Sequence, residues 1–170
     1  WHDLPQPFWV VATQNPAEQM GTNPLPESQL DRFLIQVSLG YPDEQSEKRM
    51  LARAFEARRG SPVTALNINI EEERAKAQRV NIADNVLDYL YRLVVETRNT
   101  THFQRGLSPR AALGLVALSK AWAYLHRRDY VLPDDVQHVF PYVATHRVAA
   151  NTTRSSIAIT MVLNTVPIHA

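Results

Sequence analysis

The first forty residues carry two short apolar runs, whereas the rest of the chain carries longer stretches with helical spacing. Residues 8–13 (Phe-Trp-Val-Val-Ala-Thr) and residues 34–39 (Leu-Ile-Gln-Val-Ser-Leu) are rich in β-branched and aromatic side chains. Runs of this length and composition are typical of strands buried in a sheet. Because two strands do not make a complete sheet, we expect these segments to be one part of a larger α/β core.

The pattern changes at Gly40, Tyr41 and Pro42, since proline cannot donate to a strand ladder and helical spacing follows. Helix-start signals then recur along the chain. They are Asp43, the acidic residues 71–73, Asp84, Ser108 with Pro109, and Pro133. The predicted fold class is therefore mainly α: the C-terminal piece of an α/β core with two strands, followed by a helical bundle.

Apolar stripes define the expected buried faces of the helices. The stripe residues are Leu87, Leu90, Leu93 and Val94; Leu113, Leu115, Val116, Leu118, Trp122 and Leu125; and Val136, Val139 and Phe140. Pro141 should kink or break the helix that contains it. Residues 157–166 form a weaker, final helical pattern.

Composition narrows the class of protein. The chain has 170 residues, 45% apolar and 21% charged, which is ordinary for a globular protein, and no apolar run long enough to span a bilayer. It has no cysteine, which fits a reducing compartment, and we expect a cytoplasmic location. The net charge of +1, with arginines dispersed among acids, gives no reason to expect a nucleic-acid partner.

The sequence lacks the motifs of several classes of catalytic and metal site. There is no Gly-x-x-x-x-Gly-Lys-Ser/Thr loop, and no apolar strand ends in paired acids that could hold magnesium. The six histidines show no His-x-x-x-His spacing, so we expect no metal site. The chain should contain no self-contained catalytic site.

Three polar residues nevertheless stand where phosphate chemistry would use them. Asn15 follows the first apolar run and could orient a water, although Asn before Pro is also a turn former. Arg32 could reach the phosphate of a neighbouring subunit, or could form a surface ion pair with Asp31. Arg110 lies in the first turn of a predicted helix, where backbone N–H groups favour an anion, or it is simply solvated.

These residues lie in motifs that closely resemble the MoxR family of AAA+ ATPases, and the resemblance covers nearly the whole chain. The N-terminal motifs are residues 12–22 (ATQNPAEQMGT), 25–33 (LPESQLDRF) and 40–42 (GYP). The later motifs are Thr97-Arg98, residues 106–111 (GLSPRA), residues 120–123 (KAWA), residues 128–136 (RDYVLPDDV) and His146-Arg147.

The resemblance implies specific roles. Asn15 matches sensor 1, which positions the attacking water; Arg32 matches the arginine finger, which acts on the adjoining subunit's nucleotide. Arg110 matches sensor 2, which contacts the γ-phosphate from the helical lid. Tyr41 and Pro42 match the hinge between core and lid, close to the adenine.

The resemblance also implies an organisation and an activity. Residues 1–41 would be the end of the ATPase core and residues 42–170 the lid, with the Walker A and Walker B residues preceding Trp1. The parent protein would use ATP and Mg²⁺, hydrolyse ATP to ADP and phosphate in a ring, expected to be a hexamer, and remodel or mature partner proteins as a chaperone. Von Willebrand factor A-domain proteins are the expected partners, and the fragment alone should bind no cofactor and be inactive.

A second interpretation of the sequence is a non-catalytic helical module for protein interaction. It would require a broad apolar patch to stay exposed after the helices pack. The side chains that would form this patch are Leu115, Trp122 and Tyr124.

Overall fold

The computed structural model describes residues 1–14, 25–53, 68–151 and 154–168. The chain divides into two compact units, a larger one formed by Trp1–Gln36 with Ile70–Ala170 and a smaller one formed by Val37–Asn69. Asn15, one of the predicted site residues, lies outside the described residues. Each unit is considered separately below.

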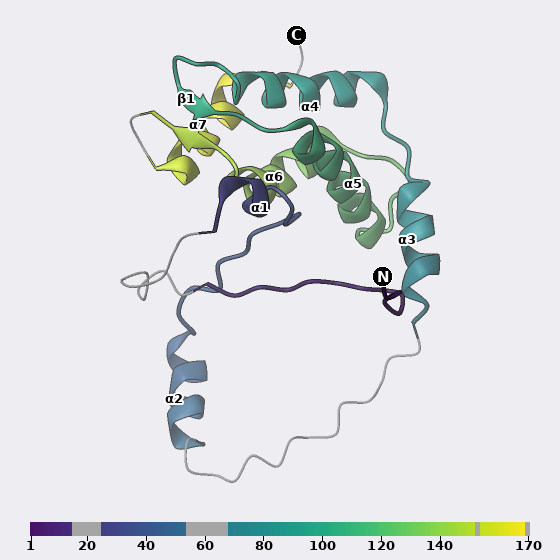
Figure 1. Cartoon of the computed structure of the whole chain (residues 1–170), viewed down its shortest axis with the longest axis vertical. Helices are drawn as coiled ribbons and strands as arrows, with labels where there is room; N and C mark the ends of the chain where they lie inside the picture. The colour runs from purple at the N-terminus through teal and green to yellow at the C-terminus, as the bar shows by residue number, and fades with distance from the viewer. Residues whose placement is uncertain (15–24, 54–67, 152–153, 169–170) are drawn as a thin grey trace. The chain divides into compact units, whose positions relative to one another are not determined.

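The described part of the chain is mostly helical, which confirms the predicted fold class (Figure 1). Its elements follow this order: α1 (Glu27–Leu30), α2 (Glu44–Ala52), α3 (Ile70–Gln78), α4 (Asp84–Glu96), β1 (Phe103–Arg105), α5 (Pro109–Leu125), α6 (Pro133–Ala144), β2 (Ala149–Ala150) and α7 (Ser155–Thr165). All of them except α2 belong to the larger unit.

The larger unit is organised around α5, which packs against α3, α4 and α6. Helix α7 packs against α4 and α6, and β1 pairs with β2 as a short antiparallel ladder in which Phe103 faces Ala150. The core between these helices is apolar. Its largest fully buried side chains include Tyr89, Leu93, Leu115, Phe140 and Ile159.

The two predicted strands are not formed in this structure. Neither residues 8–13 nor residues 34–39 have regular secondary structure. The reason is that a strand needs a hydrogen-bonded neighbour, and no ladder partner for either run is present among the described residues. The only named strands in the described part of the chain are β1 and β2.

The helix-start signals were reliable. Asp43 caps α2 by accepting a hydrogen bond from the backbone N–H of Ser46 at 2.8 Å, and Ser108 caps α5 in the same way through Ala111 at 3.1 Å. Pro133 stands in the first turn of α6. The predicted weak final helix is α7.

Three of the side chains predicted to lie on buried helix faces are exposed. Leu87, Leu113 and Leu125 are exposed, since the buried face of α4 is formed by Val86, Tyr89, Leu90, Leu93 and Val94, and that of α5 by Ala111, Leu115, Ser119 and Ala123. Pro141 does not break α6, which continues to Ala144. The last turn is held by Thr145, whose N–H and hydroxyl both donate to the Pro141 carbonyl, and by burial of Val143.

The smaller unit contains α2. No residue of α2 is buried, Met50 and Leu51 are exposed, and the helix carries an ion pair between Lys48 and Glu44 at 2.5 Å. Gly40, just before it, adopts a φ of +63°, which favours glycine. The smaller unit therefore contributes a capped, solvent-exposed helix.

Candidate functional site

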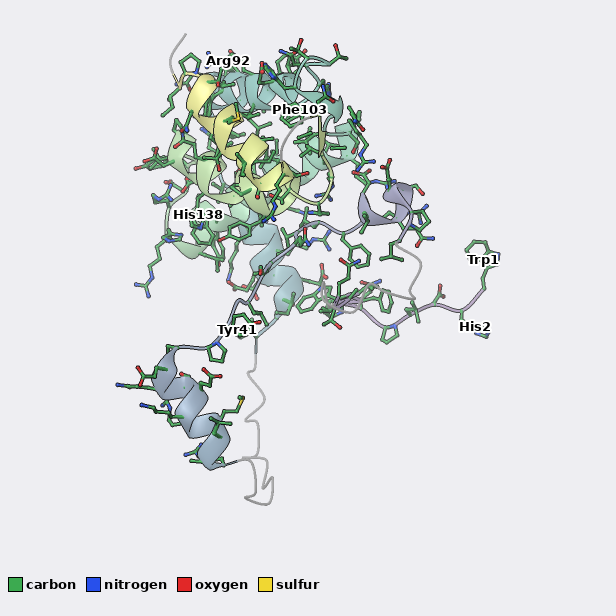
Figure 2. All side chains as sticks on the ribbon, turned by 90° about the vertical axis from the view of Figure 1, so that its left-hand side faces the viewer. Trp1, His2, Tyr41, Arg92, Phe103 and His138 are labelled. Atoms are coloured by element: carbon green, nitrogen blue, oxygen red, sulfur yellow. The ribbon has the colours of Figure 1, made fainter. Side chains whose placement is uncertain are left out.

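The candidate site residues are distributed over both units. Arg32 and Arg110 belong to the larger unit, whereas Tyr41 and Pro42 belong to the smaller one, where Tyr41 is almost fully exposed (Figure 2). Asn15 lies outside the described residues. The site can therefore be built from the larger unit alone, starting from Arg32.

Arg32 stands in a tight turn that follows α1. The turn is closed by backbone hydrogen bonds from Asp31, Arg32 and Phe33 to carbonyls of α1, at 3.0 to 3.1 Å. Asp31 and Phe33 are half-buried, but the Arg32 side chain is exposed and forms no hydrogen bond or ion pair with any described residue. Its backbone is thus held while its guanidinium is free to bind a ligand.

The surface ion pair weighed for Asp31 and Arg32 is not formed, because Asp31 pairs with Arg147 instead. Arg147 follows α6, and its side chain is only 4% exposed. Its Nε donates to Asp31 Oδ1 at 3.1 Å, and its other nitrogens donate to the carbonyls of Asp31, Phe33 and Leu34. It also donates to the carbonyl of Val143, near the end of α6, at 2.5 Å.

Arg147 therefore satisfies several carbonyls of the segment that carries Arg32. Burial lowers the pKa of the Arg147 guanidinium, while the hydrogen bond and the charge of Asp31 act in the opposite direction. A buried cation is stable only when it is paired and its hydrogen bonds are made. This guanidinium meets that condition through the segment 31–34, so the segment and the end of α6 stabilise each other.

Other contacts hold the same segment against the helices. Glu27 of α1 forms an ion pair with Arg105 of β1, and the N–H of Gln36 donates to the Tyr142 carbonyl at 2.9 Å. Leu34 lies so close to Gly114 of α5 that a Cβ at Gly114 would approach Leu34 Cδ1 to 2.7 Å. The segment is docked at several independent points.

Arg110 lies in the first turn of α5, and its side chain is exposed. That turn contains Pro109 and no acidic residue. The free N–H groups and the dipole of a helix N-terminus favour an anion there, and a guanidinium adds a second attraction for phosphate. The sequence-based interpretation of this position is chemically consistent with the structure.

Asp31 connects the two arginine-bearing elements. The hydroxyl of Ser108, the residue that caps α5, donates to Asp31 Oδ1 at 2.9 Å and lies 3.0 Å from Oδ2. The same carboxylate accepts from Arg147. Arg32 directly follows Asp31, and Arg110 lies two residues after Ser108. The hydrogen bond between Asp31 and Ser108 therefore links the two segments that carry these arginines.

His146 adds a further contact to the segment. Its Nε2 lies 3.0 Å from the Phe33 carbonyl, and its Nδ1 is buried without a hydrogen-bond partner. Burial lowers the pKa of His146; the Phe33 carbonyl opposes this shift and the nearby Arg147 charge reinforces it. His146 is therefore held neutral, as an N–H donor to Phe33.

Sequence reasoning missed the roles of Arg147 and of the Asp31–Ser108 bond. The pair His146-Arg147 stood out only as part of the family motif. The available signal was an arginine directly after a long apolar helix, but nothing in the spacing indicates which carboxylate, 116 positions earlier, it would meet. Non-local pairing of this kind is not encoded in local periodicity.

No group of three or more His, Cys, Asp or Glu residues within the described ranges is arranged to hold a metal ion. A helix long and apolar enough to cross a membrane is likewise not found in the described segments.

Two family models match the chain. The model for the ATPase family associated with various cellular activities (AAA) matches residues 1–35, and the model for the AAA lid domain matches residues 95–161. Arg32 therefore falls within the first match, and Arg110 and Arg147 fall within the second. The Asp31–Ser108 bond joins the two matched regions.

Curated relatives and a solved structure agree with these models. The chain is 40% identical over 149 residues to the uncharacterized protein YeaC of Bacillus subtilis (85% of this chain, 46% of that protein). It is 36% identical over 182 residues to the chaperone MoxR1 of Mycobacterium tuberculosis (96% of this chain, 47% of that protein). The chain thus spans about half the length of these relatives.

A crystal structure from Cytophaga hutchinsonii, described as that of a "putative ATPase", superimposes with a TM-score of 0.81 at 31% identity, covering 98% of this chain and 56% of that one. Together with the AAA and AAA lid matches and the MoxR-named relative, this similarity shows that the chain belongs to the MoxR-like AAA+ ATPases, as a C-terminal region of such a protein.

Proposed function

We propose that the protein to which this chain belongs hydrolyses ATP to ADP and phosphate, and that this chain supplies two arginines to the reaction. The main support is the state of Arg32, which is exposed and unpaired among the described residues while Asp31 and Phe33 on either side are anchored. An arginine with a fixed backbone and a free guanidinium is suited to stabilise charge on a transferring phosphoryl group.

In this proposal Arg32 acts on the nucleotide of an adjoining subunit, as an arginine finger. Arg110 contacts the γ-phosphate from the lid side, and Asn15 orients the attacking water. Tyr41 and Pro42 lie at the hinge near the adenine. This division of labour requires an oligomer, for which a hexameric ring is the arrangement we propose.

This chain contains no phosphate-cradling loop. Residues outside it would form that loop and hold Mg²⁺. When bound, Mg²⁺ supplies neutralisation of phosphate charge. The chain by itself would accordingly be inactive. The division into a core part, residues 1–41, and a lid, residues 42–170, remains part of the proposal.

The cellular role we propose is remodelling or maturation of partner proteins, with von Willebrand factor A-domain proteins as partners, in the cytoplasm. The name of the M. tuberculosis relative, a chaperone, supports the first part of this proposal.

The alternative function, a non-catalytic interaction module, requires Leu115, Trp122 and Tyr124 to form an exposed apolar patch. Leu115 is fully buried. Trp122 stacks on His138 of α6 (labelled in Figure 2), with ring centroids 4.1 Å apart, and the Tyr124 hydroxyl donates to Glu73. These three side chains therefore do not form the broad exposed patch that this alternative requires.

The test is steady-state ATP hydrolysis by the full-length protein and three variants over a range of protein concentrations. Arg32→Ala should reduce kcat by about 10³-fold while leaving ATP binding intact, since arginine fingers contribute on this scale. Arg110→Ala should reduce turnover and weaken nucleotide binding. Arg79→Ala removes another exposed arginine that is unpaired in the described part of the chain, and should behave as the wild type.

Wild-type turnover should rise with protein concentration, because the active site would be shared between subunits. Normal turnover in both Arg32→Ala and Arg110→Ala would exclude the proposed roles. No turnover in the wild type would exclude the activity.

A further inference from the structure

The Asp31 carboxylate is the point at which three separate segments meet. It accepts hydrogen bonds from Ser108, 77 positions later, and from Arg147, 116 positions later. Hydrogen bonds to an ionised acceptor are shorter and stronger than neutral ones, and here two donors converge on one partly buried carboxylate. The bond therefore constrains the geometry of both partner segments.

Each partner segment carries one of the phosphate-directed arginines. Arg32 directly follows Asp31, within a turn closed by backbone hydrogen bonds. Arg110 lies two residues after Ser108, whose hydroxyl oxygen also caps α5. Because Ser108 donates to Asp31 and accepts from Ala111 through the same oxygen, a shift of the α5 N-terminus displaces the Asp31 carboxylate.

Resting on the proposed function, we propose that Asp31 is a positioning residue that couples the two arginines through its bond to Ser108. Engagement of Arg110 with the nucleotide of its own subunit fixes the N-terminus of α5. Through Ser108 and Asp31 this fixes the turn that presents Arg32 to the adjoining subunit. Asp31 itself does not contact the nucleotide.

The coupling can be separated from the docking of the segment. Arg147 also donates to the backbone carbonyls of Asp31, Phe33 and Leu34, and these bonds do not use the Asp31 side chain. Glu27 with Arg105, and Gln36 with Tyr142, hold the segment at two further points. Asp31→Asn therefore changes the link while leaving most of the anchoring in place.

The first variant to test is Asp31→Asn in the full-length protein. An asparagine keeps the shape but removes the negative charge, so Ser108 and Arg147 lose a charge-assisted acceptor, and an N–H₂ group replaces one carboxylate oxygen near the Ser108 hydroxyl. We expect kcat for ATP hydrolysis to fall about tenfold, within the range of typical coupling between sites. KM and ATP binding should stay within about twofold, because binding contacts are untouched.

The matched control is Glu27→Gln, which removes the other carboxylate ion pair of the same short segment. Its kcat should remain that of the wild type. A double-mutant cycle with Arg110→Ala gives the readout that a merely structural role would not produce. If Asp31 acts through the α5 N-terminus, Asp31→Asn should cause little further loss in the Arg110→Ala background.

Ser108 provides a second route should Asp31→Asn fail to fold. Ser108→Thr keeps the hydroxyl and should keep kcat, whereas Ser108→Ala should lower it. Equal kcat for the Thr and Ala variants, or wild-type kcat in a folded Asp31→Asn variant, would overturn the coupling. If Arg32→Ala and Arg110→Ala have reduced turnover in the same experiment, only the coupling fails; if both are fully active, the proposed function fails.

Discussion

Arg128 and Asp135 form a two-pronged ion pair between the end of α5 and the start of α6. Arg128 Nη1 lies 2.6 Å from Asp135 Oδ2, and Nη2 lies 2.5 Å from Oδ1. The Asp135 side chain is only 4% exposed, and it also accepts the N–H of Leu132 at 2.7 Å. One carboxylate therefore fixes the connection between the two helices that pack most extensively on each other.

We expect Asp135→Asn to lower the free energy of unfolding by about 3 kcal/mol, because removing one partner of a buried ion pair leaves the other charge uncompensated. Urea denaturation of the chain would measure the loss. Glu44→Gln is the matched control, since its ion pair with Lys48 is largely exposed. That control should change the free energy of unfolding by less than about 0.5 kcal/mol. Equal effects would contradict a special role for Asp135.

The same carboxylate should make stability depend on acidity. Burial raises the pKa of Asp135, but the Arg128 guanidinium and the Leu132 N–H outweigh it and lower the pKa below its ordinary value of 3.8. A folded-state pKa below the unfolded one gives stability that is present above pH 3.8 and lost as the pH falls through the folded pKa. The difference between wild type and Asp135→Asn should therefore shrink below about pH 4.

His146 should make the free energy of unfolding depend on pH in a higher range. Its pKa is lowered from the ordinary 6.5, mainly by burial, so the folded state binds this proton less readily than the unfolded state. Stability is unaffected above pH 6.5 and falls as the pH drops below it, because the unfolded chain is protonated first. Thermal unfolding between pH 7.5 and 5 should show this loss, and His146→Gln, which can still donate to Phe33, should flatten it. An identical slope in that variant would contradict the assignment.

The sequence predicted those features that depend on local signals. Asp43, Ser108 and Pro133 marked helix starts correctly, because capping and proline placement act within one turn. The strand predictions for residues 8–13 and 34–39 were wrong because a ladder depends on neighbouring strands and not on the segment itself. Arg32 and Arg110 were recognised as candidates, and their roles remain predictions.

The contacts that organise the candidate site could not be predicted. The pairing of Asp31 with Arg147 and Ser108 joins residues more than 70 positions apart, and no periodicity relates them. The sequence offered Arg32 as the nearest partner for Asp31. The structure prefers the buried Arg147, because that guanidinium can also satisfy carbonyls of the following residues.

Arg127 adopts a backbone conformation that side chains rarely take, with a φ of 58°. It follows the C-terminal end of α5, where its N–H donates to Tyr124 and the N–H of Arg128 donates to Ala123, the bond pattern of a helix end that usually carries glycine. Arg127→Gly should raise the free energy of unfolding by up to about 1 kcal/mol by relieving this strain. Arg127→Ala keeps the Cβ and should give no gain; equal gains in urea denaturation would exclude strain as the cause.

Gly106 stands two residues before Ser108, where the chain passes close to the end of α4. A Cβ added there would lie 2.4 Å from the Thr97 carbonyl oxygen and 2.7 Å from Arg98 Cγ. Since the carbonyl belongs to the backbone, it cannot move aside as a flexible side chain would, and the next residue's N–H is bonded to Thr97 Oγ1 at 3.1 Å. Gly106→Ala should therefore cost about 1–3 kcal/mol in the free energy of unfolding.

Gly106→Ala should also disturb the candidate site, because Ser108 must keep its position to cap α5 and to donate to Asp31. In the full-length protein we expect Gly106→Ala to reduce kcat for ATP hydrolysis in proportion to its effect on the Asp31–Ser108 bond. Gly40→Ala is a comparison for stability alone: an added Cβ would meet nothing within 4 Å, but the φ of +63° favours glycine, so any loss there comes from the backbone and not from a clash. A Gly106→Ala variant as stable as the wild type would show that the chain near Thr97 can open to admit a methyl group.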